Sequence, residues 1–180
     1  MRYDAVVIGG GHSGCAEALR RASDGQKVCL VTAGLTLRAL EPDNKEKPYA
    51  ELYALTRAGV SVLRGDIAVN PVWEGQRLKQ ISTANGITLQ AEEFVLATGR
   101  FFSRGLMADM DGIREPLFGA DVNYEKDRSR WFDADFFAPQ PFESFGVKTD
   151  KKGHILIEGK PAENVFAVGK ILGGKGNAGK

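Results

Sequence analysis

The 180-residue chain has few of the residues that mark disulfide-rich, metal-binding or membrane-spanning proteins. It contains two cysteines and two histidines, too few for a disulfide framework or a patterned set of metal ligands. No apolar run reaches the roughly 20 residues that a transmembrane helix needs. The sequence opens directly on β-forming residues, so we expect no signal peptide. These features favour a cytoplasmic protein without a transmembrane segment.

The chain also lacks an excess of either charge. Lys and Arg number 24 against 23 for Asp and Glu, which gives a formal net charge of +1. So small a net charge provides no strong field to attract nucleic acid or an acidic membrane. We therefore predict no nucleic-acid partner. The length and a hydrophobic fraction of 43% suit a single domain over residues 1–180.

A glycine-rich turn at residues 9–14 is the most informative feature that is present. The turn, GGGHSG, follows the β-forming run Tyr3–Ile8 and precedes the helix-forming run Cys15–Ala22. A strand, G-x-G-x-x-G and a helix in this order are typical of the turn that binds a dinucleotide pyrophosphate. A second predicted strand, Lys27–Thr32, follows at the spacing of a βαβ unit. The alternative is a glycine-rich β-α turn that binds nothing.

Each residue of the turn has an expected role. Gly9 permits the tight turn, Gly11 leaves room for a phosphate, and Gly14 lets the helix pack closely on the strand. His12 and Ser13 lie in the same turn and are expected to line the pocket. Backbone N–H groups and the positive end of the helix dipole would then face the anion.

Further along, the hydrophobic pattern predicts one helix and several strands. A helix is expected over Tyr49–Arg57, after a polar loop from Ala33 to Lys47, and a short strand over Val60–Leu63. Three alternating segments with hairpin turns at Glu74-Gly75 and Asn85-Gly86 predict an antiparallel meander; they are Asp66–Val72, Gln76–Ala84 and Ile87–Ala91. Two continuous apolar runs predict buried parallel strands that each end in glycine; they are Glu93–Gly99 and Glu163–Gly169.

The stretch of residues 100–146 is aromatic and aperiodic, and it is expected to form an irregular lobe. So long an irregular connection is usually functional; the alternative is a surface lobe packed by its own aromatics. Within it, Arg114 and Glu115 are the best polar candidates, unless they pair and brace the loop. We expect packing roles for Phe136, Phe137 and Phe142. Outside the lobe, Cys15 and Cys29 are expected in the core and His154 in solvent.

The order of these pieces resembles a flavoprotein of the two-dinucleotide-binding type. Several specific strings resemble the B subunit of the anaerobic glycerol-3-phosphate dehydrogenase; they are Leu96–Leu106, Asp111–Val122, Trp131–Phe142, Phe145–Asp150 and Gly169–Gly174. The resemblance implies an α/β, Rossmann-like FAD/NAD(P)-binding fold, with a parallel sheet and an antiparallel three-stranded β-meander. It leaves FAD and FMN both open as the cofactor, because the family binds FMN and the wider superfamily FAD.

The resemblance also implies partners and an activity. The chain would work with two further subunits of the dehydrogenase complex, one catalytic and flavin-containing, the other carrying iron-sulfur clusters. Together they would oxidise glycerol 3-phosphate to dihydroxyacetone phosphate and pass electrons towards the quinone pool. The protein would then be cytoplasmic, or peripheral at the inner face of the cell membrane.

Site residues follow from the resemblance and from the strand ends. Thr98 and Gly99 should lie under the cofactor, and Gly169 and Lys170 beside its ribityl chain or ring. Arg100 is expected either to reach a phosphate or to be a solvent-exposed turn residue. No arrangement of side chains assigns a catalytic acid, base or nucleophile.

The chain departs from the flavoprotein pattern in three places. Thr32-Ala33-Gly34 stands where a carboxylate normally binds the ribose, so the Thr32 hydroxyl would have to make that contact. Lys170 replaces an Asp that often meets the ribityl chain. The long middle segment of the family, with its cap or substrate lobe, has no counterpart after the second strand.

Three functions remain open on sequence alone. The first is a flavin-binding electron-transfer subunit of a dehydrogenase. The second is a nucleotide-binding structural or docking module without catalysis of its own. The third is a stand-alone FAD- or NAD(P)H-dependent reductase, which the lack of a second G-x-G-x-x-G disfavours.

Overall fold

The structure is a computed structural model that describes residues 1–34 and 50–174. Three expectations from the sequence lie outside these residues. They are the loop over residues 35–47, the start of the second helix at Tyr49, and the glycine-rich end beyond residue 174.

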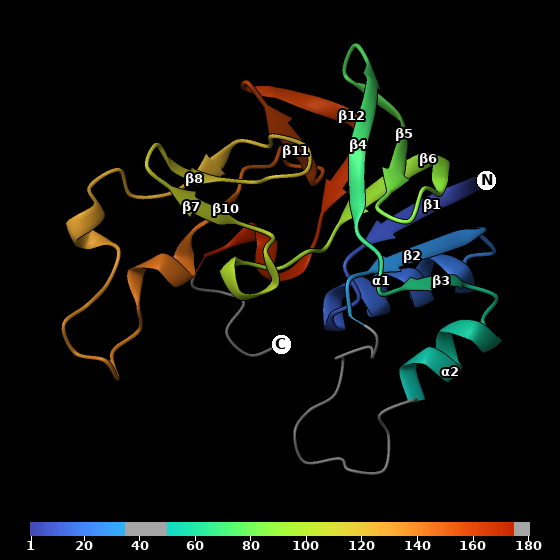
Figure 1. Ribbon diagram of the computed structural model, residues 1–180, viewed down its shortest axis with the longest axis horizontal. Helices are drawn as coiled ribbons and strands as arrows, with labels where there is room; N and C mark the ends of the chain where they lie inside the picture. The colour runs from blue at the N-terminus through green and yellow to red at the C-terminus, as the bar shows by residue number, and fades with distance from the viewer. Residues whose placement is uncertain (35–49, 175–180) are drawn as a thin grey trace.

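A largely parallel β-sheet organises the described residues (Figure 1). The sheet has eight strands, and its main path runs β11-β12-β6-β1-β2-β3. The strands from β12 to β3 are mutually parallel, and β11 is antiparallel to β12. The bounds are β1 (Arg2–Ile8), β2 (Val28–Thr32), β3 (Ser61–Arg64), β6 (Thr88–Leu96), β11 (His154–Ile157) and β12 (Lys160–Ala167). This arrangement confirms the predicted α/β, Rossmann-like fold.

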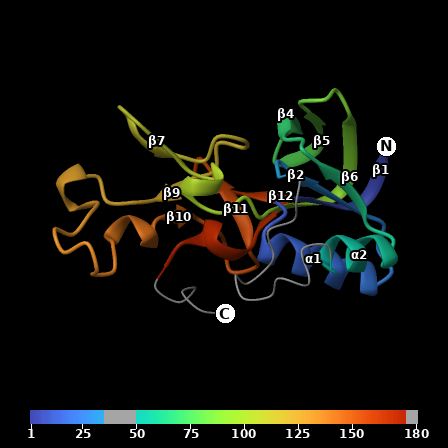
Figure 2. The same ribbon diagram turned by 60° about the horizontal axis from the view of Figure 1, so that its bottom comes forward.

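Two helices cover one face of this sheet, as Figure 2 shows. They are α1 (His12–Ser23), which connects β1 to β2, and α2 (Ala50–Arg57), which precedes β3. Helix α1 begins three residues earlier than Cys15, where the sequence pattern placed it. The last three residues of the glycine turn therefore form the first turn of the helix.

Both faces of β1 are buried, which explains its continuous apolar sequence. Ala5 and Val7 pack with Cys15 and Leu55 under the helices. Val6 and Ile8 face the opposite side, in a larger cluster that includes Phe94, Leu96 and Val165. The predicted core positions of Cys15 and Cys29 are confirmed, because the two residues are 2% and 0% exposed.

The predicted antiparallel meander is present and consists of β4, β5 and the first part of β6. Strands β4 (Ala68–Glu74) and β5 (Arg77–Thr83) join at Gly75, and β5 joins β6 at Gly86. Both glycines have positive φ, +60° and +84°, as tight hairpin turns require.

The prediction of two separate strands between residues 87 and 99 is wrong. Strand β6 is one nine-residue strand. It pairs with β5 through Gln90 and Leu89, and further along with β12 through Phe94. The pattern changes from alternating to continuously apolar because the strand passes from the meander into the middle of the parallel sheet, not because the strand stops.

The lobe predicted at residues 100–146 is mostly irregular, as expected, and it lies away from the helices (Figure 1). It contains short elements only: β7 (Met107–Asp109), β8 (Gly112–Arg114), β9 (Val122–Asn123) and the 3₁₀ turns η1 (Phe101–Ser103), η2 (Arg128–Arg130) and η3 (Pro141–Ser144). β10 (Gly146–Val147) pairs with β9. Ile113, Phe118 and Phe145 anchor the lobe, because they belong to the same core cluster as the sheet.

Two predictions about single aromatic or basic side chains are wrong. Phe136 and Phe137 do not pack into the core; they are 85% and 93% exposed at the end of the lobe. His154 is not a solvated turn residue. It begins β11, its Nδ1 lies 2.8 Å from Asp150 Oδ2, and its ring lies 4.5 Å from the ring of Phe166. Strand β11 is only four residues long, and no sequence pattern predicted it.

Candidate functional site

The carboxyl ends of β1, β6 and β12 lie side by side and form the candidate site. From β1 the chain moves outward through β2 and β3, whereas β6 and β12 lie on the other side of β1. The strand order therefore reverses between β1 and β6. Open α/β sheets bind ligands in the crevice at such a reversal. The glycine turn follows β1 at this point, and Thr98 and Gly99 follow β6.

Gly9 and Gly14 hold the turn against its neighbours by backbone contact. Gly9 has a φ of +114°, and a Cβ there would overlap the carbonyl group of Ala97. A Cβ on Gly14 would overlap the carbonyl oxygen of Gly9. Only glycine satisfies both positions. The expected roles of these two residues, the tight turn and the close packing of α1, match this geometry.

Gly11 differs from the other two glycines because the space beside it is open. A Cβ on Gly11 would meet no atom within 4 Å. Gly11 is the N-cap of α1, with no side-chain capping hydrogen bond and no acidic residue in the first turn. The positive end of the helix dipole is therefore not neutralised locally. His12 is exposed and Ser13 half-buried at this end.

The end of β12 lies directly beside the glycine turn. A Cβ on Gly169 would meet the Ser13 side chain. Gly169 begins the 3₁₀ turn η4 (Gly169–Leu172), which also carries Lys170. The structure thus brings together the first and last predicted site segments, which are about 155 residues apart in sequence.

Thr98 carries a buried hydroxyl without a partner. Its Oγ1 is the one buried side-chain N or O atom with no hydrogen bond in the described part of the chain. The next residue, Gly99, has a φ of +72°, and a Cβ there would meet the Ser103 hydroxyl. That hydroxyl donates a 2.5 Å hydrogen bond to the Thr98 carbonyl. A buried polar group without a partner costs stability, so this hydroxyl is available for a further hydrogen bond.

A cavity of about 340 Å³ adjoins Gly99. It places two cations, on Arg100 and Lys170, among aromatic side chains. The remaining lining residues are Phe101, Phe102, Ser103, Phe142 and Glu143. Arg100 is half-buried and lines the cavity, which disfavours the alternative of a plain surface turn residue. Sequence analysis missed Ser103 and Glu143, because their place in the cavity depends on η1 and η3 meeting in space.

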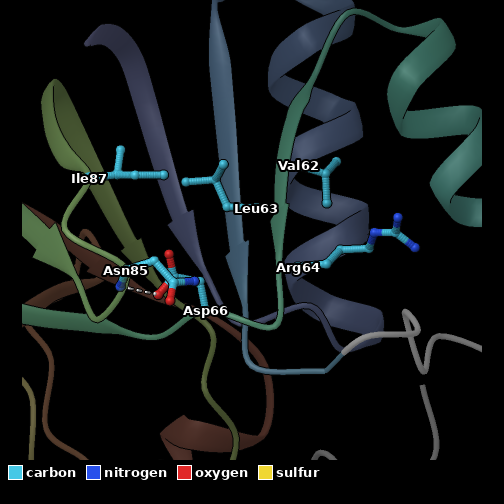
Figure 3. Close-up of a pocket in the computed structure, with 6 residues that line it drawn as sticks. All are labelled: Val62, Leu63, Arg64, Asp66, Asn85 and Ile87. Atoms are coloured by element: carbon cyan, nitrogen blue, oxygen red, sulfur yellow. Dashed lines mark hydrogen bonds between the residues drawn. The ribbon is translucent and has the colours of Figure 1, made fainter.

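A second cavity, of about 480 Å³, lies at the carboxyl end of β3 (Figure 3). In Figure 3 the side chains of Leu63 and Ile87 face each other across it, and Asp66 meets Asn85 below them. Asp66 N donates to the Thr32 carbonyl at 3.1 Å, so this cavity borders the end of β2. The two cavities therefore lie on opposite sides of the glycine turn along the carboxyl edge of the sheet.

Thr32 stands where a carboxylate normally binds the ribose, and Asp66 does not take over that role. Burial raises the pKa of Asp66, but hydrogen bonds from the Thr83 hydroxyl and from the backbone of Asn85 and Ile67 outweigh burial and lower the pKa. The carboxylate thus fastens the β5–β6 hairpin to the end of β3. Thr32 itself is 7% exposed.

Arg114 and Glu115 do not pair with each other, and neither lines the two cavities. Arg114 Nε lies 2.9 Å from Asp109 Oδ2 across the β7–β8 hairpin. Glu115 is 2% exposed, and its carboxylate accepts hydrogen bonds from the backbone N–H groups of Leu117, Phe118 and Ala120. Both residues therefore brace the lobe, which was the structural alternative for them, but each does so through its own partners and not by pairing with the other.

No group of three or more His, Cys, Asp and Glu residues in ranges 1–34 and 50–174 is placed to hold a metal ion. Burial raises the pKa of the Cys29 thiol to about 11, although a hydrogen bond with Tyr3 acts in the opposite direction.

No helix of the described segments is long and apolar enough to cross a membrane.

Comparison with curated proteins confirms the resemblance to the B subunit of the anaerobic glycerol-3-phosphate dehydrogenase. The subunit from Vibrio cholerae serotype O1 is 40% identical over 116 residues, which is 62% of this chain and 27% of the relative. That of Aliivibrio fischeri strain MJ11 is 38% identical over 136 residues, or 68% of this chain and 30% of the relative. The chain thus spans less than a third of the length of these relatives.

A solved structure and two family models were also matched. The structure of Thermovibrio ammonificans THI4 has a TM-score of 0.47 and 20% identity, and the match covers 57% of this chain and 59% of that one. Residues 4–45 match the glucose inhibited division protein A family. Residues 53–178, well over half of the chain, match the FAD binding domain. The chain belongs to the family of FAD-binding domains.

Proposed function

We propose that this chain is the FAD-binding part of a flavin-dependent oxidoreductase, with the cofactor pyrophosphate on the glycine turn at residues 9–14. The observation that carries the proposal is the buried, unpartnered Thr98 hydroxyl beside that turn, at the point where the strand order reverses. A polar atom left unpaired in such a crevice favours a ligand that pairs with it.

The residues of the turn suit a phosphate group. Gly11 leaves open space in which a phosphate can approach the backbone. Helix α1 directs its N-terminal N–H groups to the same place, and such groups bind phosphate well. His12 and Ser13 add polar side chains at the rim.

The two cavities suit the two ends of a dinucleotide. The cavity beside Leu63 and Ile87 borders Thr32 and suits the adenosine end, whose ribose would meet a hydroxyl in place of the usual carboxylate. The cavity beside Gly99 suits the flavin end, where Arg100 and Lys170 supply positive charge. The family match favours FAD over FMN. FMN also has no adenosine to occupy the cavity beside Leu63 and Ile87.

Bound FAD would supply the two-electron redox chemistry, and the protein supplies position and electrostatics. Lys170 and Arg100 stabilise negative charge that develops or binds in their cavity. Gly169 leaves room for the Ser13 side chain, because a Cβ at this position would overlap it. Phe101 and Phe142, whose rings lie 6.0 Å apart, keep part of the cavity wall apolar.

We further propose that the chain acts with other subunits in the oxidation of glycerol 3-phosphate to dihydroxyacetone phosphate. The partners would be the catalytic flavin-containing subunit and the iron-sulfur subunit of the same dehydrogenase, the latter passing electrons to quinone. The identity of 38–40% to proteins named as the B subunit of that enzyme supports this assignment.

A second candidate is a nucleotide-binding docking module without catalysis. Lys170 favours it, because it stands where flavoproteins often have an Asp that meets the ribityl chain of the flavin. Both candidates bind a nucleotide; only the first binds a flavin that partner subunits can reduce.

The test is titration of the purified chain with FAD and, separately, FMN, followed by flavin fluorescence. We expect FAD to bind more tightly than FMN. Gly11→Val should weaken FAD binding at least about 100-fold, or roughly 2.7 kcal/mol, because its side chain occupies the open space beside the turn. Ala16→Val, on the exposed side of α1, is the matched control and should bind normally. Equal FAD affinity for the Gly11→Val variant would refute the site.

A further inference from the structure

We propose that residues 132–139, here called the docking loop, form a rigid aromatic projection that inserts into an apolar cleft of a partner subunit bordered by Lys and Arg. The inference rests on the multisubunit part of the proposed function. It does not depend on the cofactor site, because the loop lies at the end of the lobe, away from the sheet (Figure 1).

The docking loop exposes three phenylalanines together. Phe132, Phe136 and Phe137 are 63%, 85% and 93% exposed, and the rings of Phe136 and Phe137 meet edge to face at 5.7 Å. The same lobe buries other phenylalanines fully, with Phe118 and Phe145 at 6% and 4% exposure. Scattered single apolar residues are common on surfaces, whereas exposed aromatic rings in contact, such as those of Phe136 and Phe137, indicate an interaction site.

Hydrogen bonds fix the shape of the loop around Gln140. The Gln140 side chain accepts from Asp133 N at 2.9 Å and donates to the carbonyls of Asp135 and Ala138 at 3.0 and 3.1 Å. At the base of the loop, Phe142 N donates to the Trp131 carbonyl at 2.9 Å. A loop already ordered in this way loses little conformational entropy on binding, and exposed aromatics are the residues that dominate interface energies.

The charge around the loop identifies the chemistry of the partner. The docking loop contains two acidic residues, Asp133 and Asp135, and no basic one. Two of the cations that precede the loop have partners: Arg128 stacks on Trp131, and Arg130 pairs with Asp127. An acidic border disfavours an anionic membrane surface. It favours a protein cleft with Lys and Arg at its rim, because interface potentials are complementary.

The test is co-purification of the tagged chain with the coexpressed flavin-containing and iron-sulfur subunits. The native chain and Met110→Ser, a 91% exposed apolar residue at a different turn, should retain the partners. Phe136→Ser with Phe137→Ser should retain at least about tenfold less. Asp133→Asn with Asp135→Asn, which keeps the acceptor atoms of the loop, should weaken retention and reduce its dependence on salt.

Several outcomes would overturn the proposal. They are undiminished retention by the double Phe variant, no retention of partners by the native chain, loop-dependent binding to phosphatidylglycerol vesicles, and loop-dependent self-association. Flavin content is measured in the same samples. If the chain retains its partners but contains no flavin, the cofactor assignment is refuted and the docking proposal is not. If it contains flavin but retains no partners, the docking proposal is refuted and the cofactor assignment is not.

Discussion

The Asn164 side chain bonds both backbone groups of Leu78, as a neighbouring strand would. Its Oδ1 accepts from Leu78 N at 2.8 Å, and its Nδ2 donates to the Leu78 carbonyl at 2.9 Å. The same Nδ2 donates to the Glu92 carbonyl at 3.0 Å. Asn164 is 2% exposed and thus ties β12 to the meander at the point where the strands do not pair directly.

Asn164→Ala should therefore destabilise the protein by about 2–4 kcal/mol, because it leaves buried backbone groups without partners. Urea unfolding followed by circular dichroism measures the change. Gln80→Ala is the matched control; its side chain makes a 3.3 Å hydrogen bond to Gln90 at the surface, and its loss should cost less than about 1 kcal/mol. A loss for Asn164→Ala no greater than for the control would disprove this role.

Gly14→Ala tests the contact between helix α1 and the glycine turn. The added Cβ would overlap the Gly9 carbonyl oxygen, so the helix must shift, and we expect a loss of about 3 kcal/mol in the free energy of unfolding. Gly11→Ala adds the same atom in open space and should change stability by less than about 1 kcal/mol. Equal effects of the two substitutions would show that the close approach does not matter.

Thr98→Val should separate the stability of the fold from cofactor binding. Valine removes a buried hydroxyl that has no partner and keeps the β-branched shape, so the cofactor-free protein should gain about 1 kcal/mol. FAD affinity should fall, because the hydroxyl is the group that we expect the ligand to pair with. Thermal unfolding with and without FAD measures both effects. A destabilised variant with unchanged FAD affinity would contradict the assignment.

Glu17 should make the protein acid-sensitive through its contacts with two arginines. Burial raises the pKa of Glu17, but hydrogen bonds from Arg20 and Arg21 outweigh burial and hold the pKa below the ordinary value of 4.5. Ionised Glu17 therefore stabilises the fold above that value, and this contribution is lost as the pH falls through the lowered pKa.

The pH dependence is measured by urea unfolding between pH 7 and pH 3. Glu17→Gln should be less stable than the native chain at pH 7 and should lose less on going to pH 3. Glu163→Gln, on the exposed side of β12, is the control and should follow the native curve. If the free energy of unfolding of Glu17→Gln falls with pH as steeply as that of the native chain, Glu17 is not the source of the acid sensitivity.

The sequence predicted those parts of the fold that local patterns determine. The hairpin glycines Gly75 and Gly86 meet a local requirement, the positive φ of a tight turn. The apolar run of β1 and the glycine turn follow local patterns that are typical of this fold. The ends of β6 and β12 were predicted approximately, because β6 ends at Leu96 and β12 at Ala167, shortly before the predicted ends at Gly99 and Gly169. Thr98 and Lys170 follow these ends, so this part of the candidate site could be predicted from the sequence.

The parts that sequence analysis missed depend on partners far away in the chain. Strand β6 continues because β5 and then β12 pair with it, which no local pattern records. Glu115 is satisfied by backbone N–H groups and not by Arg114, its neighbour in sequence. Phe137 is exposed although its hydrophobicity predicts burial. Such a disagreement between residue type and position is typical of functional surfaces.

The central claim, that the crevice at the carboxyl ends of β1, β6 and β12 binds FAD, is tested most directly by the flavin content of the purified chain. The measurement is an absorption spectrum, followed by chromatography of the flavin released on denaturation. The account predicts FAD at one equivalent per chain, either as purified or after incubation with FAD. A chain that is folded, carries no flavin and takes up none from added FAD would contradict it.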